Sequence, residues 1–163
     1  MQSMSEVQRI IDQLQRAFDG DAWSGPSLQA TLLGVSAAQA AMHPLLQAHS
    51  IWELVLHLTT WSDTVRQRIE QRQNVPPAAA DWPVAPAVPS EAAWQQANHE
   101  LCLAHERLVA LLRTLPDADL EQVLGTARDR ADGSGVSIYV LLHGTAQHYL
   151  YHAGQIALLR KLL

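Results

Sequence analysis

The chain has 163 residues, of which 48% are hydrophobic, and this is enough for one domain with a single core. Its net charge of −5 leaves no basic face for nucleic acid or for an anionic membrane. Cys102 is the single cysteine, so an intrachain disulfide is excluded. With no signal-like start and no apolar run of about eighteen residues, the sequence predicts a cytoplasmic protein without a membrane span.

Helical periodicity dominates the chain, and little of the sequence alternates as a strand does. The first predicted helix runs from about Ser5 to Phe18 and stops at Asp19-Gly20-Asp21, where the composition favours a turn. Residues 27–49 then form a predicted connection with short helical turns. One of these turns begins at Ser36 and ends at Pro44.

The second predicted helix begins with a capping box, in which Ser50 caps the helix and Glu53 reaches back. It turns polar near Arg72 and is followed by Val75–Pro89, which holds five of the eight prolines. This composition disfavours a helix or a central strand and suits an ordered, partly polyproline connection. Since the connection is longer than antiparallel neighbours need, we expect it to cross to a non-adjacent position within the same domain.

The third predicted helix begins at Ser90 and keeps a regular apolar seam until Pro116. The fourth follows the turn-rich segment Asp132-Gly133-Ser134-Gly135 and runs nearly to the end of the chain. Neither pair of helices alone offers enough surface for a core of its own. The sequence therefore predicts an all-α fold, a four-helix bundle, with residues 1–163 in one domain.

Polar residues interrupt the seam of the last helix where it should face the core. A buried imidazole needs a partner for each ring nitrogen, so two of them one turn apart favour a bound metal. Inward positions taken at steps of three and four residues are apolar at both ends and polar in the middle: Ile138, Leu141, Thr145, His148, His152, Gln155, Leu159 and Leu162.

Three histidines are candidate metal ligands. His148 and His152 stand at i and i+4, so both rings project from one side of the helix. His57 borders the inward stripe of the second helix and is the best candidate for a third ligand. Three neutral imidazoles would leave coordination positions for water or substrate, and a metal held in this way lowers the pKa of a bound water.

The alternative without a metal is that the paired histidines are core residues whose hydrogen-bond partners are Thr145, Gln155 or water. Gln155 could instead bind a ligand histidine or a metal-bound water. Glu53 lies one turn before His57 and could act as a base, although its capping role accounts for it. The other histidines are assigned no role in the site, and His43 and His49 are expected either at an entrance or at the surface.

Three segments resemble the DinB-like superfamily of metal-dependent enzymes: the run Gln147–Lys161, the stretch Ser50–Leu58 and the short Trp23–Leu28. The resemblance covers nearly the whole chain. It implies a four-helix bundle in which His57, His148 and His152 hold a divalent metal, commonly zinc or nickel. Tyr149 departs from the family pattern, because relatives often carry an acidic residue directly after the first histidine of the pair.

The resemblance also implies a reaction type, since characterised relatives include thiol-dependent transferases and isomerases that use a small thiol cofactor, and others are described as hydrolases. The leading hypothesis is a metalloenzyme in which the metal activates water or a small thiol. The alternatives are a non-catalytic metal- or ligand-binding bundle and a structural protein that dimerises through its helix faces. A homodimer is implied by resemblance only, and the expected substrate is a small neutral or electrophilic molecule.

Overall fold

The computed structural model describes residues 4–129 and 133–163, and helices predominate in them, as predicted. None of the helices in this described part has the length and apolar character that a membrane span requires. The elements in chain order are α1 (Glu6–Phe18), α2 (Leu28–Leu32), α3 (Ala37–Ala41), α4 (Ile51–Gln71), α5 (Glu91–Leu112), the 3-10 helix η1 (Asp117–Glu121), β1 (Val123–Asp129), β2 (Ser134–Ser137) and α6 (Ile138–Arg160).

Local capping sets where the long helices begin. The hydroxyl of Ser5 accepts from the backbone N–H of Gln8, and the Gln8 side chain accepts in return from the Ser5 N–H. Ser50 and Glu53 form the predicted capping box at the start of α4. Because these caps depend on residues three positions apart, the starts of α1 and α4 fall where the sequence predicts them.

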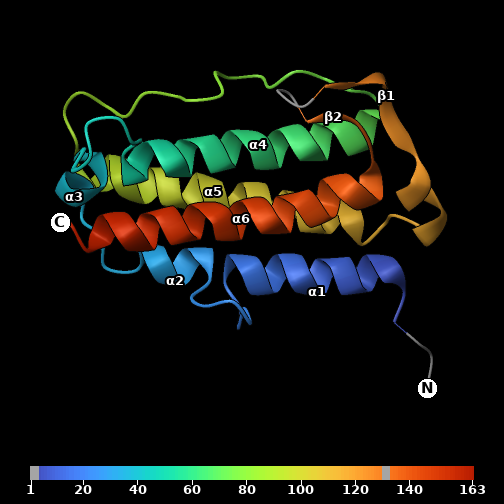
Figure 1. Cartoon of the computed structure of the whole chain (residues 1–163), viewed down its shortest axis with the longest axis horizontal. Helices are drawn as coiled ribbons and strands as arrows, with labels where there is room; N and C mark the ends of the chain where they lie inside the picture. The colour runs from blue at the N-terminus through green and yellow to red at the C-terminus, as the bar shows by residue number, and fades with distance from the viewer. Residues whose placement is uncertain (1–3, 130–132) are drawn as a thin grey trace.

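Four long helices, α1, α4, α5 and α6, lie side by side, with α1 and the short α2 following one another along α6 (Figure 1). α4 and α5 pack against each other and run in the same direction (Figure 1). The prediction that residues 75–89 lead to a non-adjacent position is therefore wrong. α4 has 21 residues and is about 31 Å long. Because α5 is parallel to α4, the connection between them must run back along the whole length of α4 before α5 can begin, and this accounts for its length.

One core runs between these helices. Leu14 of α1, Val55 and Leu58 of α4, Leu108 of α5 and Leu142 of α6 have no exposed surface at all. These side chains come from all four long helices, so every long helix contributes to the same core. The core thus holds the two helices that carry the candidate histidines, α4 and α6, in fixed register.

A short antiparallel hairpin, β1 with β2, was not predicted from the sequence. Within β1 only Leu124 is buried, so the strand has no period-two apolar pattern to reveal it. Gly135 has a φ of +67°, and a Cβ there would lie 2.4 Å from the Ala127 carbonyl oxygen, so glycine alone fits. The predicted turn at 132–135 lies at this hairpin, with Asp132 outside the described residues.

The buried stripe of α6 differs from the predicted seam. Ile138, Thr145, His152 and Leu159 are buried as expected, but Leu162 is half exposed. The predicted seam follows one edge of a wider buried arc, because α6 packs against α1, α2 and α4 together. Members of the arc that the prediction left out are Leu142, Tyr149, Ala153 and Ile156, whereas Leu141, His148 and Gln155 are only partly buried.

Candidate metal site

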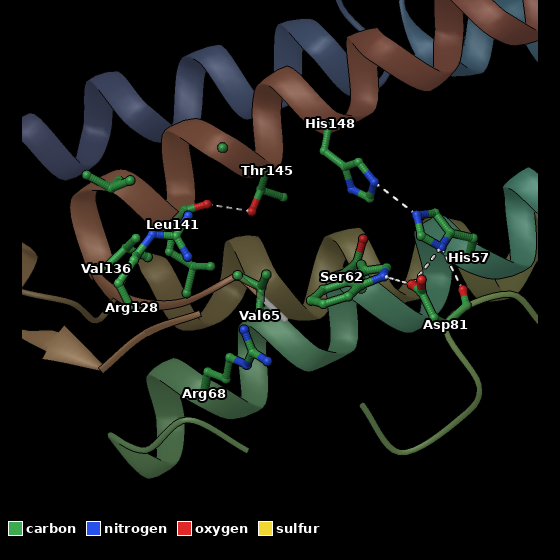
Figure 2. A pocket seen from close by; sticks show the side chains of 14 residues that line it. His57, Ser62, Val65, Arg68, Asp81, Arg128, Val136, Leu141, Thr145 and His148 are labelled. Carbon is green, nitrogen blue, oxygen red and sulfur yellow. Dashed lines mark hydrogen bonds and ion pairs between the residues drawn. The ribbon is translucent and has the colours of Figure 1, made fainter. Parts of the chain in front are cut away.

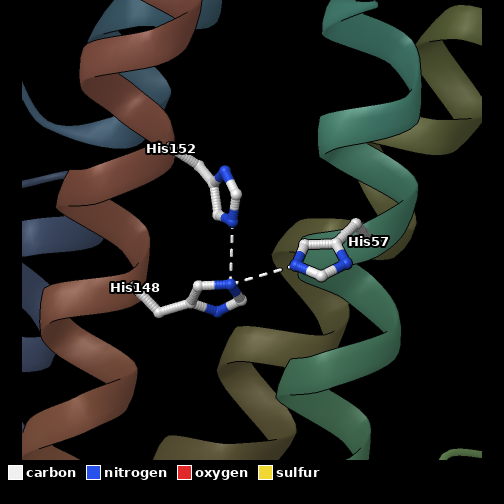
Figure 3. A group of neighbouring side chains, drawn as sticks. All are labelled: His57, His148 and His152. Atoms are coloured by element: carbon white, nitrogen blue, oxygen red, sulfur yellow. Dashed lines mark hydrogen bonds between the residues drawn. The ribbon is translucent and has the colours of Figure 1, made fainter. Parts of the chain in front are cut away.

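The three candidate histidines meet between α4 and α6 (Figure 3). The Nε2 atom of His148 lies 3.0 Å from Nε2 of His57 and 2.8 Å from Nε2 of His152. Two nitrogens bound to one tetrahedral zinc at about 2.0–2.1 Å lie about 3.3 Å apart, so a small outward movement would make room for an ion. The sequence-predicted set is therefore brought together in space.

His57 has its outer ring nitrogen fixed by the backbone. Nδ1 of His57 lies 2.6 Å from the carbonyl oxygen of Asp81 and 3.2 Å from Oδ1 of the same residue. Both are acceptors, so Nδ1 carries the proton and donates it. The Nε2 atom of His57 then presents a lone pair towards the other two rings.

His152 is fixed in the same way by a side chain of its own helix. Its Nδ1 lies 2.6 Å from Oε1 of Gln155, three residues further along α6. Nδ1 therefore donates to the amide oxygen, and Nε2 of His152 also presents a lone pair inward. A contact between Gln155 and His152 is expected both for a metal site and for paired core histidines; in a metal site, such an outer partner orients the ring of the ligand.

Without a cation, the three inward nitrogens cannot all be satisfied by one another. His148 can supply one proton from Nε2, but two lone pairs, those of His57 and His152, point at that atom. Buried polar atoms without a partner are costly, so this arrangement has an unmet hydrogen-bonding demand. A cation that accepts three lone pairs removes the conflict, and the donor set therefore fits a metal.

Burial keeps the three rings neutral and thus able to bind a cation. Burial, together with the neighbouring His152 and His57, lowers the pKa of His148 to about 3. Burial also lowers the pKa of His152 to about 4, against the opposing effect of the Gln155 contact. The pKa of His57 is likewise lowered by burial, although its contact with Asp81 opposes this. At neutral pH no proton competes with a metal for these nitrogens.

Two residues of the proline-rich connection complete the surroundings of His57, and sequence reasoning missed both. Besides its contact with His57, Asp81 accepts a hydrogen bond from Nε1 of Trp61 at 2.6 Å through Oδ1. The indole of Trp82 stacks on the His57 ring with centroids 3.9 Å apart, and His49 stacks on the opposite face of Trp82 at 3.5 Å. A tryptophan amid prolines and alanines was the available signal for a partly buried anchor in this segment.

A cavity of about 420 Å³ adjoins the histidines and is called the main cavity here (Figure 2). His57, His148 and Asp81 lie at one end of it, and Arg68 lies at the other end (Figure 2). A second cavity of about 380 Å³ touches His152 and Gln155. Because Nδ1 of His152 faces Gln155, we assign the approach to the inward nitrogens to the main cavity.

The remaining predicted candidates lie outside the main cavity. The carboxylate of Glu53 accepts from the Ser50 N–H at 2.8 Å and lies 3.0 Å from Nε2 of His43, so it is occupied by the helix cap and its neighbour. The Ser50 N–H and His43 lower the pKa of Glu53, although burial, the largest single influence, opposes them. The side chain of His49 is 43% exposed and borders the second cavity, not the main one, so it occupies the surface position that was one of its two expected placements.

Tyr149 stands where an acidic residue was expected from the resemblance, and it points away from the histidine cluster into the protein. Its hydroxyl lies 2.9 Å from Oγ of Ser62 on α4 and 3.4 Å from Nδ1 of His105 on α5. We call Ser62, His105 and Tyr149 the tyrosine network. The side chain is 1% exposed, and burial raises the pKa of Tyr149 far above its ordinary value. It therefore acts as a neutral hydrogen-bonding group.

Of the comparisons with known proteins, the one with sequence models of families finds a match. No curated protein and no solved structure was found to match the chain significantly. A sequence model of the DinB superfamily matches residues 8–156, which is most of the chain and includes all three histidines. The predicted resemblance is thus confirmed, and the chain belongs to the DinB superfamily.

Proposed function

We propose that the protein is a single-domain, four-helix-bundle metalloenzyme that holds one divalent metal through His57, His148 and His152. The metal activates either water or a small thiol, so the protein is a hydrolase or a thiol-dependent transferase. The observation that carries this proposal is the convergence of three Nε2 atoms beside a cavity. Membership of the DinB superfamily supports it independently.

Three protein ligands suit a catalytic site better than a structural one. Structural zinc sites take four protein ligands, whereas catalytic sites keep a position for water or substrate. In the described residues the cluster consists of three histidines, and two of them line the main cavity. A site with a closed coordination sphere and a non-catalytic role is the alternative.

Each residue around the cluster has a definite part in this proposal. The Asp81 carbonyl and the Gln155 amide orient the rings of His57 and His152, and the Trp82 ring shields the outer face of His57 from water. When bound, the metal supplies Lewis acidity that favours the deprotonated form of water or of a thiol. Three neutral imidazoles suit zinc and nickel, and we take zinc first because it needs no redox partner.

Metal content tests this proposal directly. Protein purified without a histidine tag, loaded with zinc and freed of excess should contain about one metal ion per chain by elemental analysis. His152→Ala should reduce this value to near zero. His99→Ala removes an exposed histidine of α5 and serves as the matched control. Wild-type protein that retains no metal, or a His152→Ala variant that retains it fully, would contradict the proposal.

Activity is tested on the same preparations. Zinc-loaded wild-type protein and the His152→Ala variant are compared in ester hydrolysis and in conjugation of a small thiol to an electrophile. We expect one of the two reactions to depend on both the metal and His152. Stoichiometric zinc without either activity would favour the non-catalytic alternative.

A further inference from the structure

The main cavity has a cationic end that lies far from the histidines (Figure 2). Arg68 follows His57 by eleven residues on α4, which is three helical turns and about 16 Å along the axis, so both side chains project from the same face. The Arg68 side chain is almost completely buried, with 1% exposure. Arg128 of β1 lines the same end.

Arg68 is held in place by its surroundings. Its Nε donates to the carbonyl oxygen of Val75 at 2.9 Å, and its guanidinium carbon lies 5.5 Å from the centroid of the Trp61 ring. An arginine keeps its charge at any pH that the protein experiences. The cavity therefore contains a fixed positive group whose position does not depend on a flexible side chain.

Apart from its charged groups, the main cavity is lined largely by apolar side chains: Val65 of α4, Val136 of β2, and Val140 and Leu141 of α6. Ser62 and Thr145 line it too, and their hydroxyls donate to carbonyls of their own helices. Asp81 lies at the histidine end, so a carboxylate faces the ligand there and an arginine faces it at the other end. Arg68 and Arg128 are the charged lining residues at the end remote from the histidines, so a ligand carboxylate placed there is attracted to them.

We propose that the main cavity binds a small molecule with an apolar middle and a carboxylate at the end remote from the histidines. The planar guanidinium of Arg68 suits the two oxygens of a carboxylate. The other end of the ligand reaches the metal, and this part rests on the proposed function. This inference departs from the sequence-based expectation of a small neutral or electrophilic molecule, because Arg68 and Arg128 lie far apart in the sequence and form no visible cluster there.

A matched pair of probes tests the proposal. Mercaptooctanoate and mercaptooctanol have the same chain and the same thiol, and differ in the carboxylate. Isothermal titration of each into zinc-loaded protein should show about tenfold tighter binding of the acid, as expected for a charge-assisted pair. Equal affinities in the wild-type protein would overturn the proposal without the use of any variant.

Variants assign the effect to Arg68. Arg68→Gln should reduce the preference for the acid to less than about twofold, with the zinc content unchanged. Arg66→Gln is the matched control, since Arg66 lies on the same helix, pairs with Asp63 and Glu70 and does not line the cavity. If Arg68→Gln does not fold, Arg68→Lys replaces it, and a severalfold weaker preference is expected because the planar fork is lost. A preference unchanged in a folded Arg68 variant would overturn the role of Arg68.

Two further titrations separate this inference from the proposed function. Octanoate and octanol are compared on metal-free protein, where a preference for octanoate supports the cationic end even if the protein takes up no zinc. In that case the proposed function would fail and the inference would stand. Tighter binding of octyl phosphate than of octanoate would overturn the assignment of a carboxylate, because a phosphate site would then be indicated.

Discussion

The histidine cluster and the tyrosine network are two sets of polar side chains in the interior, and both connect α4 to α6. Along α6 their members are neighbours, since Tyr149 of the network lies between His148 and His152 of the cluster. In the tyrosine network the hydroxyl of Ser62 donates to the Leu58 carbonyl and lies 2.9 Å from the Tyr149 hydroxyl, so both hydroxyls are paired with protein groups. In the histidine cluster two lone pairs compete for one proton. Burial with complete pairing indicates structure, whereas burial with converging lone pairs indicates a cation site.

The largest expected effect is that of replacing His148, and it tests whether the histidine cluster differs from the tyrosine network in binding a metal. Zinc at a thousand times its dissociation constant should stabilise the wild-type protein by about 4 kcal/mol, and His148→Ala should lose nearly all of this gain. Thermal unfolding with and without zinc measures the difference. Tyr149→Phe changes the adjacent residue and should keep the shift. A His148→Ala variant with the full zinc-dependent shift would show that the cluster is not a metal site.

His105 in the tyrosine network should make the metal-free protein sensitive to acid. Burial lowers its pKa from 6.5 to about 4, so the unfolded state takes up a proton first as the pH falls. The stability present above about pH 6.5 is therefore lost progressively towards pH 4, by about 3 kcal/mol for this residue. Urea unfolding across this range should show a smaller loss for His105→Leu than for the wild-type protein. Parallel profiles would contradict this role.

Gln155 gives a finer test of the metal site, because it contacts His152 of the histidine cluster without being a ligand itself. Gln155→Leu removes the acceptor of the His152 Nδ1 proton and should weaken zinc binding by about ten- to hundredfold. Competition with a chelator of known affinity measures this change. Gln147→Leu changes an exposed glutamine on the same helix and should leave the affinity unaltered. Equal losses in both variants would point to a general effect on α6.

The smallest expected effect is that of Tyr149→Phe. Loss of its hydroxyl removes a buried hydrogen bond to Ser62 and should cost about 1 kcal/mol of unfolding free energy. Ser62→Ala should cost a similar amount, and the double variant should cost less than the two together, because both break the same bond. Strictly additive costs in urea unfolding would show that the two hydroxyls are not coupled.

Much of the fold could be predicted from the sequence because its determinants are local. Ser5 and Ser50 each cap a helix through a partner three residues away, and apolar residues at helical spacing mark the buried faces. His148 and His152 could be paired for the same reason, since a helix places i and i+4 on one side. His57 borders the stripe of α4, which was enough to select it.

The remaining features depend on contacts between distant segments. Asp117 of η1 accepts from the backbone N–H groups of Glu6 and Val7, and no pattern near α1 reveals this second cap. In the same way, the approach of Asp81 to His57 depends on the path of the connection over α4. The direction of α5 relative to α4 also follows from that path, and neither composition nor periodicity specifies it.

The segment between Gln71 and Ser90 has the least regular backbone between the long helices, yet part of it should tolerate no change of length. Surface loops usually accept insertions and deletions. Here Asp81 and Trp82 are both anchored on His57, so removing one residue ahead of them would pull a carbonyl oxygen and an indole off the same ring. The same deletion placed after Trp82 would shorten the path to α5 and pull on both contacts from the other side. The two anchored residues therefore divide the segment into two stretches, each with its own minimum length.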